Sequence, residues 1–202
     1  GLDTLKIYQQ QVGETHYKTA KIALNIGKLF LKSDTRRQNH KAIEYFELSF
    51  MNEKVAPYGL GFLIEAYDRT DQSELSIPYL QKLATFRQAH SYQTATHEPV
   101  YVPPPQYPRL AQMQRVEGYA VVKYTIDRNG QVQNLELIEE KPASLGFGRA
   151  SLQAAEKLKH LPKISEGKFV ERPGVTYKYT FKKSKSQYLR HFKINKTRTI
   201  VT

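Results

Sequence analysis

The sequence predicts an α+β fold, in which an N-terminal α-helical repeat domain precedes a small antiparallel sheet with one packed helix. Apolar residues recur at three- and four-residue steps as far as Leu83, a spacing typical of amphipathic helices. Beyond residue 118 they alternate with polar residues, a pattern typical of half-buried strands. A proline-rich stretch separates the two patterns. We therefore expect a helical repeat domain over residues 1–90, a linker over 91–108, and a second domain with a basic tail over 109–202.

Four helices explain the N-terminal pattern, and a fifth is expected over Thr4–Val12. Polar breaks at residues 33–35, 52–53 and 70–71 separate the four. Their apolar stripes are Ile22, Ile26, Leu29 and Phe30; Ile43, Phe46 and Phe50; Leu60, Leu63, Ile64 and Tyr67; and Ile77, Leu80 and Leu83. This spacing places each stripe on one side of its helix, where it can be buried.

The helical segment is similar to itself after a shift of 34 residues, with small residues falling on small ones and large on large. The matched pairs are Ile26 with Leu60, Gly27 with Gly61, Leu29 with Leu63, Phe30 with Ile64, Ala42 with Ser76, Ile43 with Ile77, Tyr45 with Tyr79, and Phe46 with Leu80. A period of this length indicates stacked helix-turn-helix units. In such units the glycine lets two helices approach closely, so we expect Gly27 and Gly61 to play the same part.

These residues resemble tetratricopeptide-type repeats, and among them the Sel-like variety. The resemblance depends on the run Lys41-Ala42-Ile43-Glu44-Tyr45-Phe46, on Asn52 and Ala56, and on Leu60-Gly61-Phe62. Repeats of this type usually bind proteins on their concave face, so the resemblance implies protein binding. With two units, a rigid spacer stays open as the alternative.

The second half begins after the run Pro103-Pro104-Pro105-Gln106-Tyr107-Pro108. Consecutive prolines fix φ near about −65° and favour an extended segment, so this run predicts a domain boundary. A strand over Tyr119–Ile126, the turn Asp127-Arg128-Asn129-Gly130 and a strand over Gln131–Ile138 then predict a hairpin. A helix with Phe147, Ala150, Ala154, Leu158 and Leu161 on one stripe is expected to end at Pro162. The last strand places Val175, Tyr177, Tyr179 and Phe181 on one face and Thr176, Lys178 and Thr180 on the other.

Positive charge is concentrated in this second half. Residues 1–95 hold 12 Lys+Arg and 10 Asp+Glu, whereas residues 96–202 hold 19 and 9. Nine Lys or Arg follow Glu171, which is the last acidic residue. A basic stretch of this kind suits nucleic acid, anionic lipid or an acidic protein, and an ordinary solvated tail is the alternative.

Motifs of catalysis and of cofactor or metal binding are missing from the sequence, so we expect a protein that is not an enzyme. There is no cysteine, no pair of histidines at helical ligand spacing, no phosphate-binding loop and no Gly-x-Ser-x-Gly elbow. We expect the six histidines to be ordinary surface or half-buried residues. Glu139-Glu140 is expected to be a solvated strand terminus, and Gly146-Phe147-Gly148 a helix entry. No apolar stretch approaches the roughly 20 residues of a membrane-spanning helix.

The second half resembles the C-terminal domain of the TonB family. The residues that carry the resemblance are Tyr107-Pro108 before a short helix over Arg109–Gln114, Glu117-Gly118, Ile126-Asp127-x-x-Gly130-x-Val132, Phe147-x-x-Ala150 through Ala154, and Pro162 with Gly167. They span about residues 99–182. The family tends to place aromatic residues where this chain has Leu158 and His160.

This resemblance implies a binding function. A strand at the edge of a sheet exposes unpaired backbone groups that an extended peptide can meet, and in this family the peptide comes from an outer-membrane transporter. The implied peptide-binding residues are Gln106, Tyr107, Pro108, Val175, Thr176, Tyr177, Lys178, Tyr179, Thr180 and Phe181. The alternative for each is a structural part, with Tyr107 and Pro108 as a staple that opens the fold.

The interpretation is a periplasmic protein that couples inner-membrane energy to uptake by contacting an outer-membrane TonB-dependent transporter or another envelope protein. Inner-membrane motor proteins are implied as further partners, a segment absent from this chain would supply any membrane anchor, and a homodimer is a further option. An envelope scaffold that transmits no force is the second interpretation. A nucleic-acid platform is the third and least favoured, with Tyr119, Tyr124, Tyr177, Tyr179, Phe181, Tyr188 and Phe192 as its stacking rings.

Overall fold

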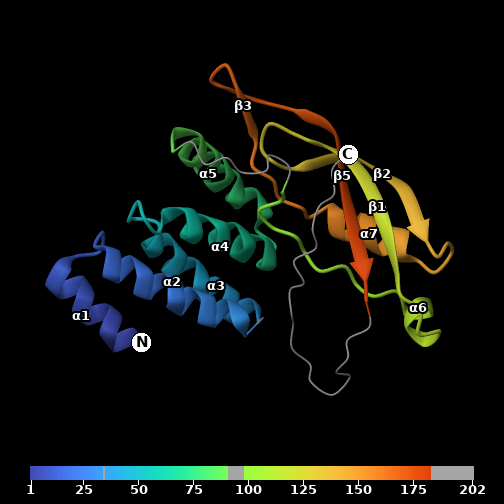
Figure 1. The fold of residues 1–202 in the computed structure, drawn as a ribbon. Helices are drawn as coiled ribbons and strands as arrows, with labels where there is room; N and C mark the ends of the chain where they lie inside the picture. Colours follow the sequence, from blue (N-terminus) through green and yellow to red (C-terminus); the bar gives the residue numbers. More distant parts are fainter. Residues whose placement is uncertain (34, 91–97, 183–202) are drawn as a thin grey trace. The chain divides into compact units, whose positions relative to one another are not determined.

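The computed structural model describes residues 1–33, 35–90 and 98–182. Backbone contacts divide the chain into two compact units (Figure 1). The first takes its residues from 1–94 and 161–169, and the second from 95–160 and 170–202. The linker expected over 91–108 stays a prediction, because residues 91–97 lie outside the described residues.

The first unit is helical, as predicted. Its elements are α1 (Leu2–Val12), α2 (Tyr17–Lys32), α3 (Arg36–Ser49), α4 (Ala56–Arg69), the short 3₁₀ helix η1 (Ser73–Ser76) and α5 (Ile77–Ala89). Side chains cap two of them: the His16 ring accepts from the Lys18 N–H at the start of α2, and the Thr35 hydroxyl accepts from the Gln38 N–H at the start of α3. Such caps satisfy backbone donors that have no partner within the helix.

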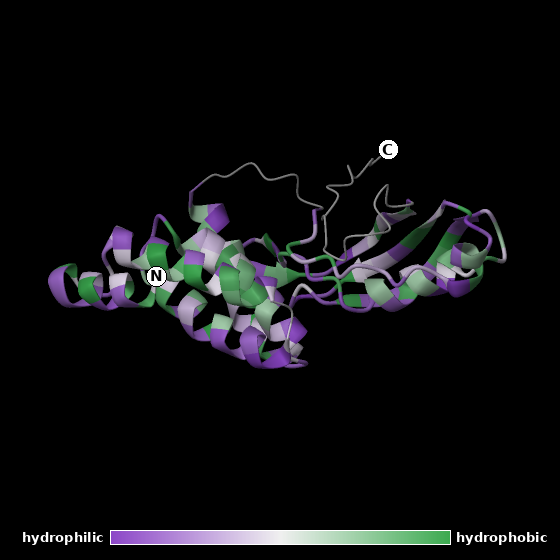
Figure 2. Cartoon of the chain, turned by 90° about the horizontal axis from the view of Figure 1, so that it is seen from below, coloured by the Kyte–Doolittle hydropathy of each residue, from purple (hydrophilic) through white to green (hydrophobic). Residues whose placement is uncertain are grey.

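The core of this unit forms where α2, α3 and α4 meet. Phe46 of α3 is fully buried and stacks on Phe62 of α4, with 5.5 Å between the ring centroids. On the other side of this ring lies Gly27 of α2, where an added Cβ would be 2.5 Å from the Phe46 ring. Gly27 therefore permits the close approach of two helices that the sequence predicted. Figure 2 shows the resulting alternation of hydrophobic and hydrophilic residues along these helices.

The second predicted copy of this packing differs from the first. An added Cβ at Gly61 would have no atom within 4 Å, and the close approach of α4 to α3 occurs instead at Gly59, beside Ser49. Likewise Leu29 is 70% exposed, whereas its counterpart Leu63 is fully buried. We expected Gly27 and Gly61 to permit the same close approach of two helices, and for Gly61 this was wrong. The reason is that α4 packs, through Leu63 and Gly59, against a preceding pair of helices, whereas α2 has no such pair before it. The assignment to tetratricopeptide-type or Sel-like repeats stays a prediction.

The second unit contains a small antiparallel sheet, as predicted. Its sheet and helices are α6 (Arg109–Met113), β1 (Gly118–Ile126), β2 (Val132–Lys141), α7 (Phe147–Ala155) and β5 (Arg172–Phe181). The strand order is β2-β1-β5, so β1 is central (Figure 1). Along the chain between α7 and β5, the short strands β3 (Lys163–Ser165) and β4 (Lys168–Val170) form a separate two-stranded sheet that the sequence did not predict. Backbone contacts assign these strands, as far as residue 169, to the first unit.

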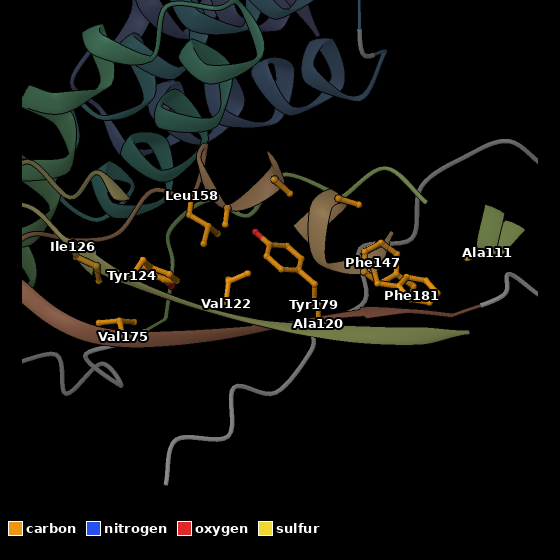
Figure 3. Close-up of a cluster of buried hydrophobic side chains, with 13 residues drawn as sticks. Ala111, Ala120, Val122, Tyr124, Ile126, Phe147, Leu158, Val175, Tyr179 and Phe181 are labelled. Carbon is orange, nitrogen blue, oxygen red and sulfur yellow. The ribbon is translucent and has the colours of Figure 1, made fainter. Parts of the chain in front are cut away.

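The core of the second unit lies between this sheet and α7. Figure 3 shows side chains of β1 and β5, among them Val122 and Tyr179, pointing to the same side of the sheet as Phe147 of α7. Two glycines make the contact close. An added Cβ would clash with the Phe147 ring at Gly118, and at Gly148 it would lie 2.5 Å from Leu137 Cδ2.

The end of α7 differs from the prediction. The helix ends at Ala155 rather than continuing to Leu161. The chain after it turns inward, so that Leu158 is buried, Lys159 forms isolated bridges with Tyr101 and Gln131, and the His160 N–H donates to Gly130 O. These long-range backbone hydrogen bonds replace the helical ones that the apolar stripe predicted.

Two further expectations about side chains were wrong. His160 is 1% exposed rather than superficial, and its Nε2 lies 2.9 Å from the buried hydroxyl of Tyr124. Glu140 is not a simple solvated strand terminus, because its Oε1 accepts hydrogen bonds from the N–H groups of Gly146 (3.0 Å) and Phe147 (2.9 Å). A carboxylate at this place satisfies free backbone donors and interacts favourably with the positive end of α7.

Candidate functional site

Strand β5 is one edge of the three-stranded sheet, as the sequence predicted. From Val175 to Phe181 its residues pair one for one with Tyr124 to Gly118 of β1, without a register shift. The shift in this pair of strands occurs before that stretch, near Gly174, which has a φ of +73°. In an antiparallel edge strand, alternate residues direct their N–H and C=O groups away from the sheet. The stretch Val175–Phe181 therefore offers a regular row of backbone donors and acceptors.

The opposite edge, strand β2, is irregular. Its pairing with β1 shifts register twice, between Val121 and Val122 and between Lys123 and Thr125. Asn134 lies in the second irregularity and has a φ of +53°. Bulges of this kind twist an edge and interrupt its row of backbone groups, which disfavours the addition of another strand. No pattern in the sequence predicts these shifts.

The side chains of β5 divide into two sets, as predicted. Val175, Tyr179 and Phe181 are buried and Tyr177 is half-buried against the core, whereas Thr176 and Lys178 are exposed and Thr180 is half-buried on the other face. A peptide beside this strand would therefore meet the side chains of the second set directly. The side chains of the first set pack in the core and hold the strand in place.

The tyrosines of the buried set share one environment. Tyr179 is 3% exposed, and its hydroxyl has no hydrogen-bond partner among the described residues. Burial raises the pKa of Tyr179, and the neighbouring hydroxyls of Tyr177 and Tyr124 raise it further. Burial also raises the pKa of Tyr177, with a smaller contribution from the carboxylate of Glu98. These phenols stay protonated at neutral pH and act as packing groups.

The upstream segment of the predicted site lies beside the C-terminal end of β5. The Tyr107 ring meets the Phe181 ring edge-on with 5.7 Å between centroids, and its hydroxyl donates a 2.7 Å hydrogen bond to Val116 O. Pro108 is the residue before α6. Both are half-buried, whereas Gln106 is exposed. Tyr107 therefore has a structural part in the fold, whereas the side chain of Gln106 is accessible to solvent.

The exposed face of the sheet carries a charge network that the sequence analysis missed. The Lys178 Nζ lies 3.6 Å from the centroid of the Tyr119 ring, and the Tyr119 hydroxyl donates to Glu139 Oε1 at 3.0 Å. Glu139 also forms a 2.7 Å ion pair with Lys141. The hydrogen bonds from Lys141 and then from Tyr119 lower the pKa of Glu139. Residues of all three strands take part, so a single strand pattern could not reveal the network.

This arrangement weakens the interpretation as a nucleic-acid platform. Three of its proposed stacking rings, those of Tyr124, Tyr179 and Phe181, are buried in the core, and the Tyr119 ring is covered by Lys178. Stacking on bases requires exposed ring faces. Tyr177 is half-buried against the core. The last two candidates, Tyr188 and Phe192 at the basic tail, lie outside the described residues.

Metal sites and membrane-spanning helices are the other features relevant to function. Within residues 1–33, 35–90 and 98–182, no group of three or more His, Asp or Glu side chains is arranged to hold a metal ion. In the same residues, no helix combines the length and apolar character needed to cross a membrane.

The fold is a small α+β domain whose sheet has one regular edge. Residues 103–182 match the family described as Gram-negative bacterial TonB protein C-terminal. Residues 103–182 are thus a TonB C-terminal domain, which confirms the resemblance found in the sequence.

Two curated relatives agree with this family match, and two solved structures are similar to part of this chain. Protein TonB of Pseudomonas aeruginosa is 36% identical over 75 residues, which cover 37% of this chain and 22% of that protein. Protein TonB of Escherichia coli is 36% identical over 58 residues, which cover 29% and 24%. The solution NMR structure of the Pseudomonas aeruginosa TonB CTD is 32% identical, with 48% of this chain and 95% of that chain covered and a TM-score of 0.38. The TonB2 protein of Vibrio anguillarum is 33% identical, with 46% and 87% covered and a TM-score of 0.36. The chain spans less than a quarter of the length of these curated relatives.

Proposed function

We propose that the second unit binds an extended segment of an outer-membrane TonB-dependent transporter in the periplasm, by addition of that segment to β5. The observation that carries this proposal is the uninterrupted register from Val175 to Phe181 at the edge of the sheet. Main-chain hydrogen bonds would supply the affinity, and the side chains of Thr176, Lys178 and Thr180 would select among peptides. The names of the curated relatives, both Protein TonB, support this function.

In the full process, the domain would couple inner-membrane energy to uptake through motor proteins of the inner membrane. The competing proposal is an envelope scaffold that binds the same kind of partner without transmitting force. It is favoured by the helical unit that precedes the domain, because such a unit adds a second surface for proteins. Both proposals share the same strand addition and assign no catalysis to the chain.

Cysteine cross-linking tests the strand addition directly, since the chain has no cysteine of its own. Single variants Thr176→Cys and Thr180→Cys place a thiol on the exposed face of β5, and Gln133→Cys and Glu136→Cys are matched controls on β2. The probe is a synthetic peptide of a transporter's periplasmic N-terminal segment, with one cysteine moved along it. Strand addition predicts disulfides at every second peptide position with the β5 thiols, because side chains alternate between faces.

Two outcomes would contradict strand addition at β5. One is equal cross-linking yield with the β2 and β5 thiols, and the other is a yield that does not alternate with every second position of the cysteine in the peptide. To separate the two proposals, a variant that cross-links normally is tested for uptake of the transporter's substrate in cells with and without a proton gradient. Energy coupling predicts uptake that requires both the chain and the gradient. Uptake that is unchanged without the chain would favour the scaffold.

A further inference from the structure

The exposed face of α2 is a row of lysines. The helix has four lysines and no acidic residue, and all four lysines are exposed. The row consists of Lys18, Lys21, Lys28 and Lys32, with the exposed Asn25 between them. Their spacing of three, seven and four residues keeps them on one side of the helix over a length of about 21 Å. We call these five residues the lysine face.

The ammonium groups of three of these lysines lie over aromatic rings. The Nζ of Lys18 lies 5.8 Å from the Tyr8 ring centroid, and that of Lys21 lies 5.4 Å from the Tyr17 ring. The Nζ of Lys28 lies 5.3 Å from the ring of Phe62, which belongs to α4. A cation held over a ring loses part of its conformational freedom before any partner arrives. The ammonium groups are thus partly ordered in advance.

An exposed aromatic residue extends this surface onto α4. Tyr58 is 65% exposed and precedes Phe62 by one helical turn, so both side chains lie on the same side of α4. The acidic residue of that side, Glu65, forms a 2.6 Å ion pair with Arg69 of the same helix. The carboxylate of Glu65 is therefore engaged within α4, and the lysine face keeps its positive charge.

We propose that the lysine face, together with Tyr58, binds an acidic segment of a partner protein. Carboxylates on one face of an extended strand repeat every 6.8 Å or so. Successive lysines of the face are about 4.5, 10.5 and 6 Å apart along the helix axis, and their long flexible side chains can adjust to that repeat. Such a segment can meet several ammonium groups at once and place an apolar side chain on Tyr58. This surface is separate from the strand addition at β5, because it uses residues 8–62 of the first unit.

The same observations disfavour other anionic partners. A helix that lies on a membrane buries a continuous apolar face in the lipid, whereas Ala20, Ala23 and Ile26 of α2 are buried within the first unit. Two apolar residues of α2, Tyr17 and Leu29, are exposed, too few to form such a face. Bases of nucleic acid stack on open ring faces, but the rings of Tyr8, Tyr17 and Phe62 carry ammonium groups, which leaves the exposed ring of Tyr58 without a neighbouring open ring to continue a stack. An acidic protein segment requires neither.

The test uses the full chain and a fluorescein-labelled dodecapeptide of alternating glutamate and valine, with binding followed by fluorescence anisotropy. The double variant Lys21→Glu/Lys28→Glu reverses two charges of the lysine face. The matched control, Lys41→Glu/Lys82→Glu, reverses two exposed lysines in α3 and α5 that also lie over rings, those of Phe30 and Phe50. Both variants change net charge and lose ring contacts equally, so circular dichroism should report equal folding.

We expect binding to weaken about tenfold in the first variant and less than about twofold in the control. Replacing Tyr58 with Ala should weaken binding about threefold without changing its salt dependence, since no charge is removed. Equal weakening in both double variants would overturn the proposal, because only net charge would then matter. It would also be overturned by equal affinity for a peptide with glutamine in place of glutamate, by no binding of the acidic peptide, or by tighter binding to phosphatidylglycerol vesicles than to the peptide.

Discussion

The three glycines in the helices of the first unit predict three different responses to one added methyl group. At Gly61 of α4, a Cβ would have no atom within 4 Å. At Gly27 of α2, it would lie 2.5, 2.7 and 3.0 Å from three atoms of the Phe46 ring. This ring is fully buried, so it cannot move aside into solvent.

The expected magnitudes follow from these contacts. Replacing a glycine by alanine within a helix favours the helix by about 1 kcal/mol. Gly61→Ala has no opposing cost and should raise the free energy of unfolding by about 1 kcal/mol. For Gly27→Ala, overpacking costs about 1–3 kcal/mol, and contact with three ring atoms places it at the upper end. The net effect should be a loss of about 2 kcal/mol.

Urea denaturation of the full chain, followed by circular dichroism at a helix-sensitive wavelength, measures both values. Gly59→Ala is the control in the same helix as Gly61, and it should destabilise because its Cβ would lie 3.1 Å from the backbone N of Phe50 as well as against Ser49. Destabilisation by Gly61→Ala as large as that of Gly27→Ala would refute the reasoning. It would instead indicate that both glycines lie at a close contact between two helices, as the repeat pattern predicted.

Three further predictions concern hydrogen bonds. Tyr107→Phe keeps the ring but removes the bond that its hydroxyl donates to a backbone carbonyl, so urea denaturation should show a loss of about 1 kcal/mol, with transporter-peptide binding unchanged. Tyr124→Phe removes the buried bond to His160 and should cost about 1–3 kcal/mol in the same assay, and no loss would contradict that bond. A hydrogen bond to the backbone carbonyl of Phe86, followed by one to Glu53, raises the pKa of His90. An NMR titration should place the midpoint of His90 above about 6.5. Replacing Glu53 with Gln should lower this midpoint. Because the raised pKa belongs to the folded state, any stabilisation from protonated His90 is present at low pH and is lost as pH rises through this midpoint.

Local patterns predicted the helices and the faces of the strands. The alternation from Val175 to Phe181 fixed which side chains of β5 are buried, because one face of an edge strand meets the core and the other does not. Similarly, the steps between Phe46 and its neighbours identified the buried side of α3. Such patterns depend on neighbours along one element, which the sequence displays directly.

Features that depend on distant residues could not be predicted in this way. The hydrogen bonds of Glu140 to the start of α7 require the hairpin and the helix to be placed together. Beside the register shifts of β2, Leu137 contacts Gly148 of α7, and beyond the end of α7 a bridge joins Lys159 to Tyr101; both contacts join residues of different segments. In the candidate site, the contacts of Tyr107 with Phe181 and Val116 also join residues distant in the sequence. The sequence therefore left open whether Tyr107 binds peptide or is a structural residue.

The contrast between the two margins of the sheet limits the stoichiometry of any complex formed by backbone pairing. With β2 interrupted, the described part of the domain offers one docking position for a single incoming strand. Two copies that paired through β5 would each occupy the other's position, so self-association would end at a pair and could not propagate into a fibre. The same pairing would compete directly with a transporter segment, and the concentration of the domain would then set how much of it is free to engage its target.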